Sequence, residues 1–443
     1  MIERQILTSL RQWRADKQRK PLILRGARQV GKTSVVELFG QEFDQFISLN
    51  LEITEERVLF ERELPIDKLV QSIFFHKNCT RDNKKTLLFL DEIQHSPEAV
   101  AILRYFYEKV PDLYVIAAGS LLETLIDKQV SFPVGRVEYM YLFPLSFLEY
   151  LKAVGEVQAA EMLQVNEVPP NYAHEKLLGL FHQYTMIGGM PEVVAHYAEH
   201  QDLTALQKIY NSLLVGYQDD VEKYAESAAQ ARIMRHIVRH VPLNAGERIK
   251  FEGFGQSNYR SREVGEAFRM LEKSMLLQLT YPTIRTEPPF ESNQKKSPRL
   301  QFLDTGLMNH SVGLQKEFIQ LKDLNNLYRG KLTEHIVGQQ LLSTGLLKNN
   351  ELMFWVRDKA QSSAEVDFVL PRGNMLLPIE VKSGATGALR SLHSFMERTA
   401  GKKAIRLYAG ESSVETIQTA NGHSYELQHL PYYLAGDWLL ESA

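Results

Sequence analysis

Residues 21–40 read PLILRGARQVGKTSVVELFG, in which an apolar run is followed by a glycine-containing loop and a helix-like run. The loop fits the pattern G-x-x-x-x-G-K-[ST] from Gly26 to Thr33, a motif that requires a strand before it and a helix after it. Its glycines let backbone N–H groups turn toward phosphates, and the helix adds the positive end of its dipole. We therefore predict that the loop binds a nucleotide through a contiguous set of residues: Gly26, Ala27, Arg28, Gln29, Val30, Gly31, Lys32, Thr33 and Ser34.

A second segment supports this prediction. In the motif, Lys32 reaches the outer phosphates and Thr33 holds Mg²⁺. The run TLLFLDEIQ at residues 86–94 is an apolar strand that ends in two acids, which is costly inside a protein unless they meet a cation. Asp91 is expected to bind Mg²⁺, directly or through water, and Glu92 to polarise the attacking water. An exposed acidic turn is the alternative for the two acids alone, but together with the loop they indicate ATP hydrolysis with Mg²⁺.

The overall composition limits the class of protein. A chain of 443 residues predicts two or three domains, and residues 1–150 alternate apolar runs with helical patterns, as in a parallel sheet covered by helices. No apolar stretch has the length of a membrane span, and residues 1–20 lack the apolar centre of a signal peptide. The single cysteine, Cys79, excludes an internal disulfide, so we expect a cytoplasmic protein without membrane contact.

The two segments resemble the Walker A and Walker B motifs of AAA-type ATPases, and they are most similar to a bacterial and archaeal group related to the STAND-type ATPases. In that group the strand after Walker B ends in a polar sensor of the γ-phosphate, and VIAAGS ends here in Ser120. The group then carries Gly-Arg and a Pro-Leu-Ser-Phe-x-Glu stretch, which Gly135-Arg136 and PLSFLEY from Pro144 match. The resemblance implies that Arg136 is an arginine finger or a sensor of the terminal phosphate, with a surface arginine as the alternative.

The same resemblance extends to a Gly-x-Pro motif of the STAND lid, which packs near the nucleotide. Gly189-Met190-Pro191 matches it, so Pro191 is implied as a nucleotide-binding residue. A simple turn between two helices is the alternative for this segment.

Charged residues interrupt two apolar runs near the C-terminus. Residues 364–384 read AEVDFVLPRGNMLLPIEVKSG, and a turn at residues 371–374 that pairs Leu370 with Met375 puts three charges on one face, because side chains alternate along a strand: Asp367, Glu380 and Lys382. The two carboxylates become diagonal neighbours within reach of one cation. Carboxylates suit Mg²⁺ or Mn²⁺, and such a metal would activate water and stabilise charge on a phosphodiester, aided by the lysine.

This hairpin resembles the restriction-endonuclease-like PD-(D/E)XK superfamily, through Asp367 and the run Glu380-Val381-Lys382. Many members add a glutamate on the helix before the core sheet, and GKLTEHIVGQQLL at residues 330–342 matches that helix, with Glu334 as the acid and Gly338 leaving room beside it. The residue before Asp367 is valine instead of proline, which the superfamily tolerates. The resemblance implies a metal site of Glu334, Asp367 and Glu380. A surface ion pair is the alternative, and some related ATPase fusions keep this fold without activity.

The middle of the chain resembles a winged helix. Residues 257–282 match its recognition helix and first wing strand, and RLQFLDTGL at residues 299–307 matches the second. Such domains often bind DNA through this helix and the wing, and Arg260, Arg262 and Arg269 lie on or near it. The net charge of −3 argues against a wholly basic nucleic-acid coat. Packing on the nucleotide domain as a relay is the alternative.

Together the resemblances imply an α/β fold in four parts: a P-loop AAA-type ATPase core at residues 1–150, a helical lid at 151–225, a winged helix at 226–318 and a restriction-endonuclease-like domain at 319–443. They imply ATP and Mg²⁺ as cofactors, with Mn²⁺ as an option at the nuclease-like site, and DNA as the partner. Assembly into a homo-oligomer stays open.

The leading hypothesis is an ATP-hydrolysing protein coupled to a metal-dependent nuclease-like domain that acts on nucleic acid. One alternative is a regulator in which the ATP state controls DNA binding or assembly and the last domain is catalytically inactive. A protein-interaction switch without nucleic acid is the third hypothesis.

Overall fold

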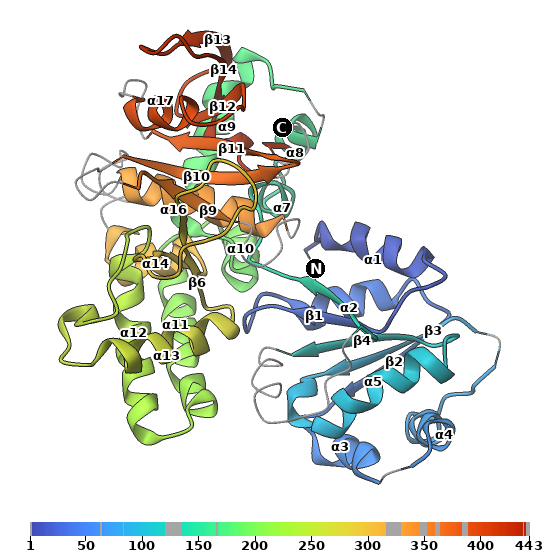
Figure 1. Ribbon diagram of the computed structural model, residues 1–443. Coiled ribbons are helices and arrows are strands. Elements are labelled where there is room, and N and C mark those ends of the chain that lie inside the picture. Colours follow the sequence, from blue (N-terminus) through green and yellow to red (C-terminus); the bar gives the residue numbers. More distant parts are fainter. Residues whose placement is uncertain are drawn as a thin grey trace. The chain divides into compact units, whose positions relative to one another are not determined.

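The structure is a computed structural model that describes residues 2–62, 64–82, 84–119, 135–164, 167–315, 329–344, 352–358, 364–382, 389–436 and 438–439. It contains two compact units (Figure 1). The first comprises the described residues up to Phe143 and also Lys273–Met275, and the second comprises Pro144–Glu272 and the described residues from Leu276 onward. Nearly all described residues of the expected lid, winged helix and nuclease-like domain therefore belong to one unit.

The first unit is built on a parallel sheet with the strand order β2-β3-β4-β1-β5, which confirms the expected parallel sheet. The strands are β1 (Leu22–Arg25), β2 (Gln45–Asn50), β3 (Thr86–Asp91), β4 (Tyr114–Gly119) and β5 (Glu138–Tyr141). The sequence did not predict β5, because this edge strand is partly exposed and lacks an apolar run. Parallel strands end on the same edge, so the phosphate-binding loop after β1 lies near the acids at the end of β3.

Helices cover both faces of this sheet. They are α1 (Ile6–Ala15), α2 (Lys32–Gly40), α3 (Thr54–Glu61), α4 (Ile66–His76) and α5 (Pro97–Lys109), with a 3-10 turn η1 (Ile93–His95) after β3. Alternate strand residues such as Ile47, Leu49 and Leu88 share one apolar core with α3, α4 and α5, and α2 packs against β3 and β4. Burial on both faces explains why the strands read as continuous apolar runs.

The second unit begins with helices: α7 (Phe147–Ala153), α8 (Val157–Gln164), α9 (Asn171–Ile187), α10 (Pro191–His200), α11 (Leu206–Tyr224), α12 (Ala228–Asn244), α13 (Ser261–Lys273) and α14 (Thr305–Ser311). A 3-10 turn η2 (Phe254–Gln256) precedes α13. A capping box starts α7, in which Ser146 and Glu149 each bond the other's backbone N–H. Among the helices of the described ranges, none is long and apolar enough to cross a membrane.

The C-terminal part of this unit is a mixed sheet in the order β13-β14-β12-β11-β10-β9-β7. Its strands are β7 (Pro282–Thr283), β9 (Met353–Val356), β10 (Glu365–Arg372), β11 (Met375–Val381), β12 (Lys403–Tyr408), β13 (Ser413–Gln418) and β14 (Ser424–Pro431), the last followed by η3 (Tyr432–Leu434). Helix α17 (Arg390–Met396) packs on β10 and β11, and α16 (Arg329–Ser343) also packs on β11. The restriction-endonuclease-like fold of this part stays a prediction.

The hairpin register differs from the expected one by two residues. Strand β10 continues to Arg372, which pairs with Met375 around a Gly373-Asn374 turn, and Phe368 pairs with Ile379. The same register, continued by one residue, would place Asp367 opposite Glu380. A shift of two residues keeps every side chain on its face, so the predicted shared face is compatible with the observed register.

The two strands expected to flank the wing pair with each other. The segment between them, residues 281–298, is attached to the C-terminal sheet. Strand β6 (Leu277–Thr280) lies antiparallel to β8 (Arg299–Phe302), whereas β7, which follows β6 at once, joins the C-terminal sheet parallel to β9. Thr286 donates to the Arg398 carbonyl at 2.7 Å, and Phe290 packs on the C-terminal core. The wing is thus attached to the sheet that carries the hairpin.

Buried polar groups connect three segments: the expected lid, the segment after β8, which we call the wing exit, and α16. We call these groups the polar joint. The carboxylate of Asp304 is fully buried and accepts hydrogen bonds from the backbone N–H of Gly189 at 2.6 Å and of Leu307 at 3.0 Å. Gln339 of α16 donates to Asp304 at 3.3 Å and accepts from the Thr305 N–H at 2.9 Å. The Gly-x-Pro segment that the sequence assigned to nucleotide binding therefore contacts Asp304.

Candidate functional site

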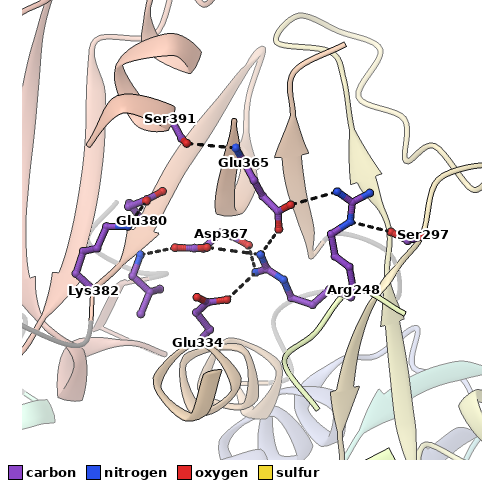
Figure 2. Close-up of polar contacts among 10 residues, drawn as sticks. Arg248, Ser297, Glu334, Glu365, Asp367, Glu380, Lys382 and Ser391 are labelled. Carbon is purple, nitrogen blue, oxygen red and sulfur yellow. Dashed lines mark hydrogen bonds and ion pairs between the residues drawn. The ribbon is translucent and has the colours of Figure 1, made fainter. Parts of the chain in front are cut away.

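The predicted nuclease-like acids meet at one place in the second unit. Glu380 and Asp367 come from β11 and β10, and Glu334 comes from α16. Figure 2 shows them together with Glu365, two residues before Asp367 on β10. We call Glu334, Glu365, Asp367 and Glu380 the carboxylate cluster. The sequence missed Glu365, although the two-residue spacing from Asp367 was a usable signal for a shared strand face.

Lys382 lies beside the cluster as expected. Its ammonium Nζ is 2.5 Å from Glu380 Oε1 (Figure 2), and this carboxylate raises the pKa of Lys382 although burial alone would lower it. The second oxygen of Glu380, Oε2, is buried and has no hydrogen-bond partner among the described residues. A buried carboxylate oxygen without a partner carries a large desolvation penalty, so it is available to a further cation.

The sequence also missed the residue that neutralises most of the cluster. The guanidinium of Arg299, on β8, pairs with Glu365, with Asp367 Oδ1 at 3.5 Å and with Glu334 Oε2 at 3.7 Å. It also donates to the Asp367 carbonyl at 2.8 Å. Arg299 is 68 residues before Asp367 in the sequence, and no local pattern connects them.

Two members of the cluster resist ionisation. Burial raises the pKa of Glu334 well above its ordinary value, and the charge of Asp367 raises it further, against Arg299. Burial and Asp367 likewise raise the pKa of Glu380, against Lys382. The pKa of Arg299 is itself raised, because the charges of the acids outweigh its burial. Burial and mutual repulsion thus oppose the ionisation of all four acids at once.

The cluster has the chemistry of a divalent-metal site without its geometry. Carboxylate oxygens suit Mg²⁺ or Mn²⁺, and Glu380 Oε2 is available. Within the described ranges, however, no three acidic, histidine or cysteine side chains lie close enough together to hold a metal ion. The remaining oxygen of Asp367, Oδ2, accepts from the Val381 N–H at 2.8 Å. The predicted metal site of Glu334, Asp367 and Glu380 is thus not formed as arranged here.

The phosphate-binding loop has the expected backbone. Gly31 has φ 95° and Gln29 φ 65°, both left-handed, which turns the loop into the N-terminus of α2. A Cβ on Gly26 would lie 2.5 Å from the Leu142 carbonyl oxygen, so only glycine fits there.

Two side chains of the loop, those of Lys32 and Thr33, make hydrogen bonds within the ATPase domain. The Lys32 Nζ donates to the carbonyls of Gly26 at 2.9 Å and Ala27 at 2.8 Å, both within the loop. Burial lowers its pKa to about 8. Thr33 Oγ1 donates to Asp91 Oδ2 at 2.7 Å, so the two residues predicted to hold Mg²⁺ are adjacent.

These features agree with a comparison to known families. Residues 18–151 match the family described as AAA domain. The N-terminal part of the chain is an AAA-type ATPase domain. Domains of this type use a nucleotide with Mg²⁺. Two further families match, each described as a domain of unknown function: DUF8612 at residues 178–317 and DUF4143 at residues 329–427. No curated protein matches the chain.

The solved structures that match this chain include three with low sequence identity. A Walker-type ATPase of Pyrococcus abyssi is 14% identical over 70% of this chain and 96% of its own, with a TM-score of 0.45. The Orc1 protein of Aeropyrum pernix in complex with DNA is 14% identical over 72% and 94%, with a TM-score of 0.30. A STAND protein of Pyrococcus horikoshii with a tetratricopeptide repeat sensor is 12% identical over 74% and 44%, with a TM-score of 0.28. We draw no conclusion from likenesses this weak.

The predicted catalytic acid of the ATPase domain, Glu92, has a partner that the sequence did not predict. Glu92 has φ 50°, and Gln94 donates its amide to the Glu92 carboxylate. A Cβ on Gly119 would lie 2.3 Å from Gln94 Oε1, so the end of β4 leaves space for this amide. Gln94 thereby orients Glu92. The predicted sensor Ser120 lies outside the described residues, and the roles of Glu92 and Pro191 stay predictions.

Arg136 lies away from the phosphate-binding loop of its own ATPase domain. It is two residues before β5, which runs parallel to β1 and pairs Glu138 with Leu22. Arg136 is therefore beside the start of β1, whereas the loop follows its end, and four strand residues separate these edges by about 13 Å. Its Nε donates to Glu108 at 2.8 Å on the protein surface. The arginine-finger role of Arg136 stays a prediction, and it would require a neighbouring copy of the chain.

Proposed function

We propose that this protein is an ATP-hydrolysing switch whose C-terminal domain is a metal-dependent nuclease-like module that acts on nucleic acid. The ATPase part rests on the AAA family match and on the Lys32, Thr33 and Asp91 geometry. The observation that supports the nuclease-like part is the meeting of Asp367, Glu380 and Lys382 beside Glu334, with Glu380 Oε2 buried and available. When bound, a divalent cation would activate water and stabilise charge on a phosphodiester.

DNA is the proposed partner. Arg262 and Arg269 of α13 are exposed, as the recognition helix of a winged helix requires. Arg262 also pairs with Glu266 at 2.9 Å, so the surface of this helix is mixed in charge. Because the wing is attached to the C-terminal sheet, α13 is the element that would enter a groove of the DNA.

One experiment tests the nuclease-like function. Plasmid DNA and single-stranded RNA are incubated with the full chain and Mg²⁺ or Mn²⁺, with and without ATP. We expect metal-dependent cleavage that Asp367→Ala, Glu380→Ala and Lys382→Ala abolish. Cleavage that survives these three substitutions would come from a contaminant or another site.

The structure also favours a second function, because the guanidinium of Arg299 already neutralises much of the cluster. If the acids only pair with Arg299 and never bind metal, the domain is catalytically inactive. The protein would then be a regulator in which ATP controls DNA binding or assembly. In that case no cleavage occurs with any metal, while DNA binding measured by fluorescence anisotropy responds to ATP. If the chain binds neither metal nor DNA, the remaining hypothesis is a protein-interaction switch without nucleic acid.

A further inference from the structure

Arg299 is held in the carboxylate cluster by more than charge. Its side chain is only 7% exposed and its guanidinium stacks over the rings of Phe354 at 5.0 Å and Phe368 at 5.7 Å. It pairs with Glu334, Glu365 and Asp367. A buried arginine with acids in its plane and rings on its faces is well ordered, so it is a built part of the site.

The guanidinium uses the oxygens that a metal ion would need. It pairs with Asp367 Oδ1 and Glu334 Oε2, and the Val381 N–H uses the second Asp367 oxygen. A divalent cation bound by these two residues would lie next to the guanidinium, and like charges at such a distance repel strongly in a buried site. Arg299 and a metal ion therefore compete for one position.

The competing residue belongs to the wing and not to the nuclease-like domain. Strand β8 also lies against α16, where Gln301 donates to the His335 carbonyl at 2.8 Å and the Phe302 N–H donates to His335 Nε2 at 3.0 Å. A Cβ on Gly338 would lie 2.6 Å from Gln301 Oε1, so the glycine expected to leave room beside Glu334 makes room for the wing strand. The position of Arg299 thus depends on how β8 lies on α16.

We propose that Arg299 is an internal cation of the carboxylate cluster, and that a divalent metal ion binds Asp367 and Glu334, with Glu380 beside them, only when the guanidinium leaves. This inference rests on the proposed nuclease-like function and adds its control: the wing strand decides whether the cluster holds metal. If the guanidinium occupies its position in about nine molecules of ten, the apparent dissociation constant for metal is about tenfold above the intrinsic one.

Metal binding without nucleotide tests this proposal. Mn²⁺ is titrated into the full chain by calorimetry in the absence of ATP, because the phosphate-binding loop holds its metal with nucleotide. Arg299→Gln removes the charge at similar length, and we expect it to bind Mn²⁺ about tenfold more tightly than the parent. Its melting temperature should fall in EDTA and recover with Mn²⁺.

Arg248→Gln is the matched control. Arg248 pairs with Glu365 at 3.3 Å but with no other member of the cluster, so this variant loses a nearby charge without opening the metal position and should bind Mn²⁺ like the parent. Where Arg299→Gln does not fold, Arg299→Lys replaces it, because the ammonium keeps the charge but not the fork, and a smaller gain in affinity is expected. No gain in that variant overturns the proposal.

The other outcomes separate this inference from the proposed function. If parent and Arg299→Gln bind Mn²⁺ equally, and Asp367→Asn abolishes binding in both, the site holds metal beside the arginine and the exchange is refuted. If neither binds Mn²⁺, the metal-dependent function fails together with the exchange, and Arg299 is a permanent partner of the acids.

Discussion

The surroundings of Lys32 in the ATPase domain determine its protonation. Lys32 is buried against the carbonyls of its own loop, which provide dipoles but no full negative charge. Asp91 and Glu92 favour the ammonium, yet burial prevails and lowers the pKa of Lys32 to about 8. Phosphate oxygens would replace these carbonyls as partners, so nucleotide binding and protonation of this lysine are linked.

We predict from this linkage that ATP affinity falls at alkaline pH. Only the charged lysine binds ATP well, and its pKa in the free protein is about 8. ATP affinity is therefore full well below pH 8 and falls about tenfold for each pH unit above it. Calorimetry in buffers of different ionisation enthalpy should show proton uptake on binding at high pH. In Lys32→Arg, whose guanidinium stays charged, the profile should be flat. Equal pH dependence in both proteins would place the titrating group elsewhere.

A second prediction concerns Glu92 and its partner. Glu92→Gln keeps the shape of the side chain but loses the charge that orients water, so ATP should stay bound while turnover falls by about 10²-fold or more. Single-turnover hydrolysis separates these two effects. Gln94→Ala should lower turnover less, because it frees the Glu92 carboxylate without removing it. Full turnover in Glu92→Gln would exclude this residue as the catalytic base.

At the scale of elements, the second unit is held together by buried polar groups that connect distant segments. The end of α9 approaches the start of α14 so closely that a Cβ on Gly306 would lie 2.0 Å from the Ile187 carbonyl oxygen. Tyr184 of α9 donates to the Leu145 carbonyl at 2.7 Å and accepts from Gln340 of α16 at 2.7 Å. Lid, wing exit and α16 therefore form one cooperative element, because each supplies partners that the others leave unsatisfied.

We predict that Asp304 is the most sensitive position of this joint. Asp304→Ala leaves the N–H groups of Gly189 and Leu307 without their acceptor, and two unsatisfied buried donors cost about 2–6 kcal/mol in the free energy of unfolding. Urea unfolding followed by tryptophan fluorescence measures the loss. Asp304→Asn, which keeps one acceptor oxygen, should lose clearly less. Equal losses in both variants would show that charge instead of hydrogen bonding holds the joint.

At the scale of the whole molecule, we predict that hydrolysis depends on Arg136 of a neighbouring copy. Its place beside the start of β1, paired with Glu108, separates it from the loop of its own domain, whereas an arginine finger in trans acts on the site of a neighbour. A chain of this kind would hydrolyse ATP faster as its concentration rises.

Mixing two inactive variants tests this role. Arg136→Ala should bind ATP normally but hydrolyse it slowly, by about 10²-fold or more, and Glu92→Gln should also be slow. In a mixture, the intact site of an Arg136→Ala copy receives the arginine of a Glu92→Gln copy, so part of the activity should return. The prediction is wrong if Arg136→Ala hydrolyses ATP at the parental rate and the mixture shows only the summed activities of its two components. Arg136 would then only form a surface ion pair.

The sequence by itself determined what is local in the chain. The phosphate-binding loop, the acids after β3 and the shared face of Asp367 and Glu380 follow from glycine positions, apolar runs and strand periodicity, which act over a few residues. The predicted pairing of Leu370 with Met375 was wrong by two residues, and an even shift keeps each side chain on its face. The relation of Arg299 to Asp367, the attachment of β7 to the C-terminal sheet and the contact between Gly189 and Asp304 were decided only by the tertiary structure. These contacts join segments far apart in the sequence, and burial of one segment by another leaves no periodic signal in either.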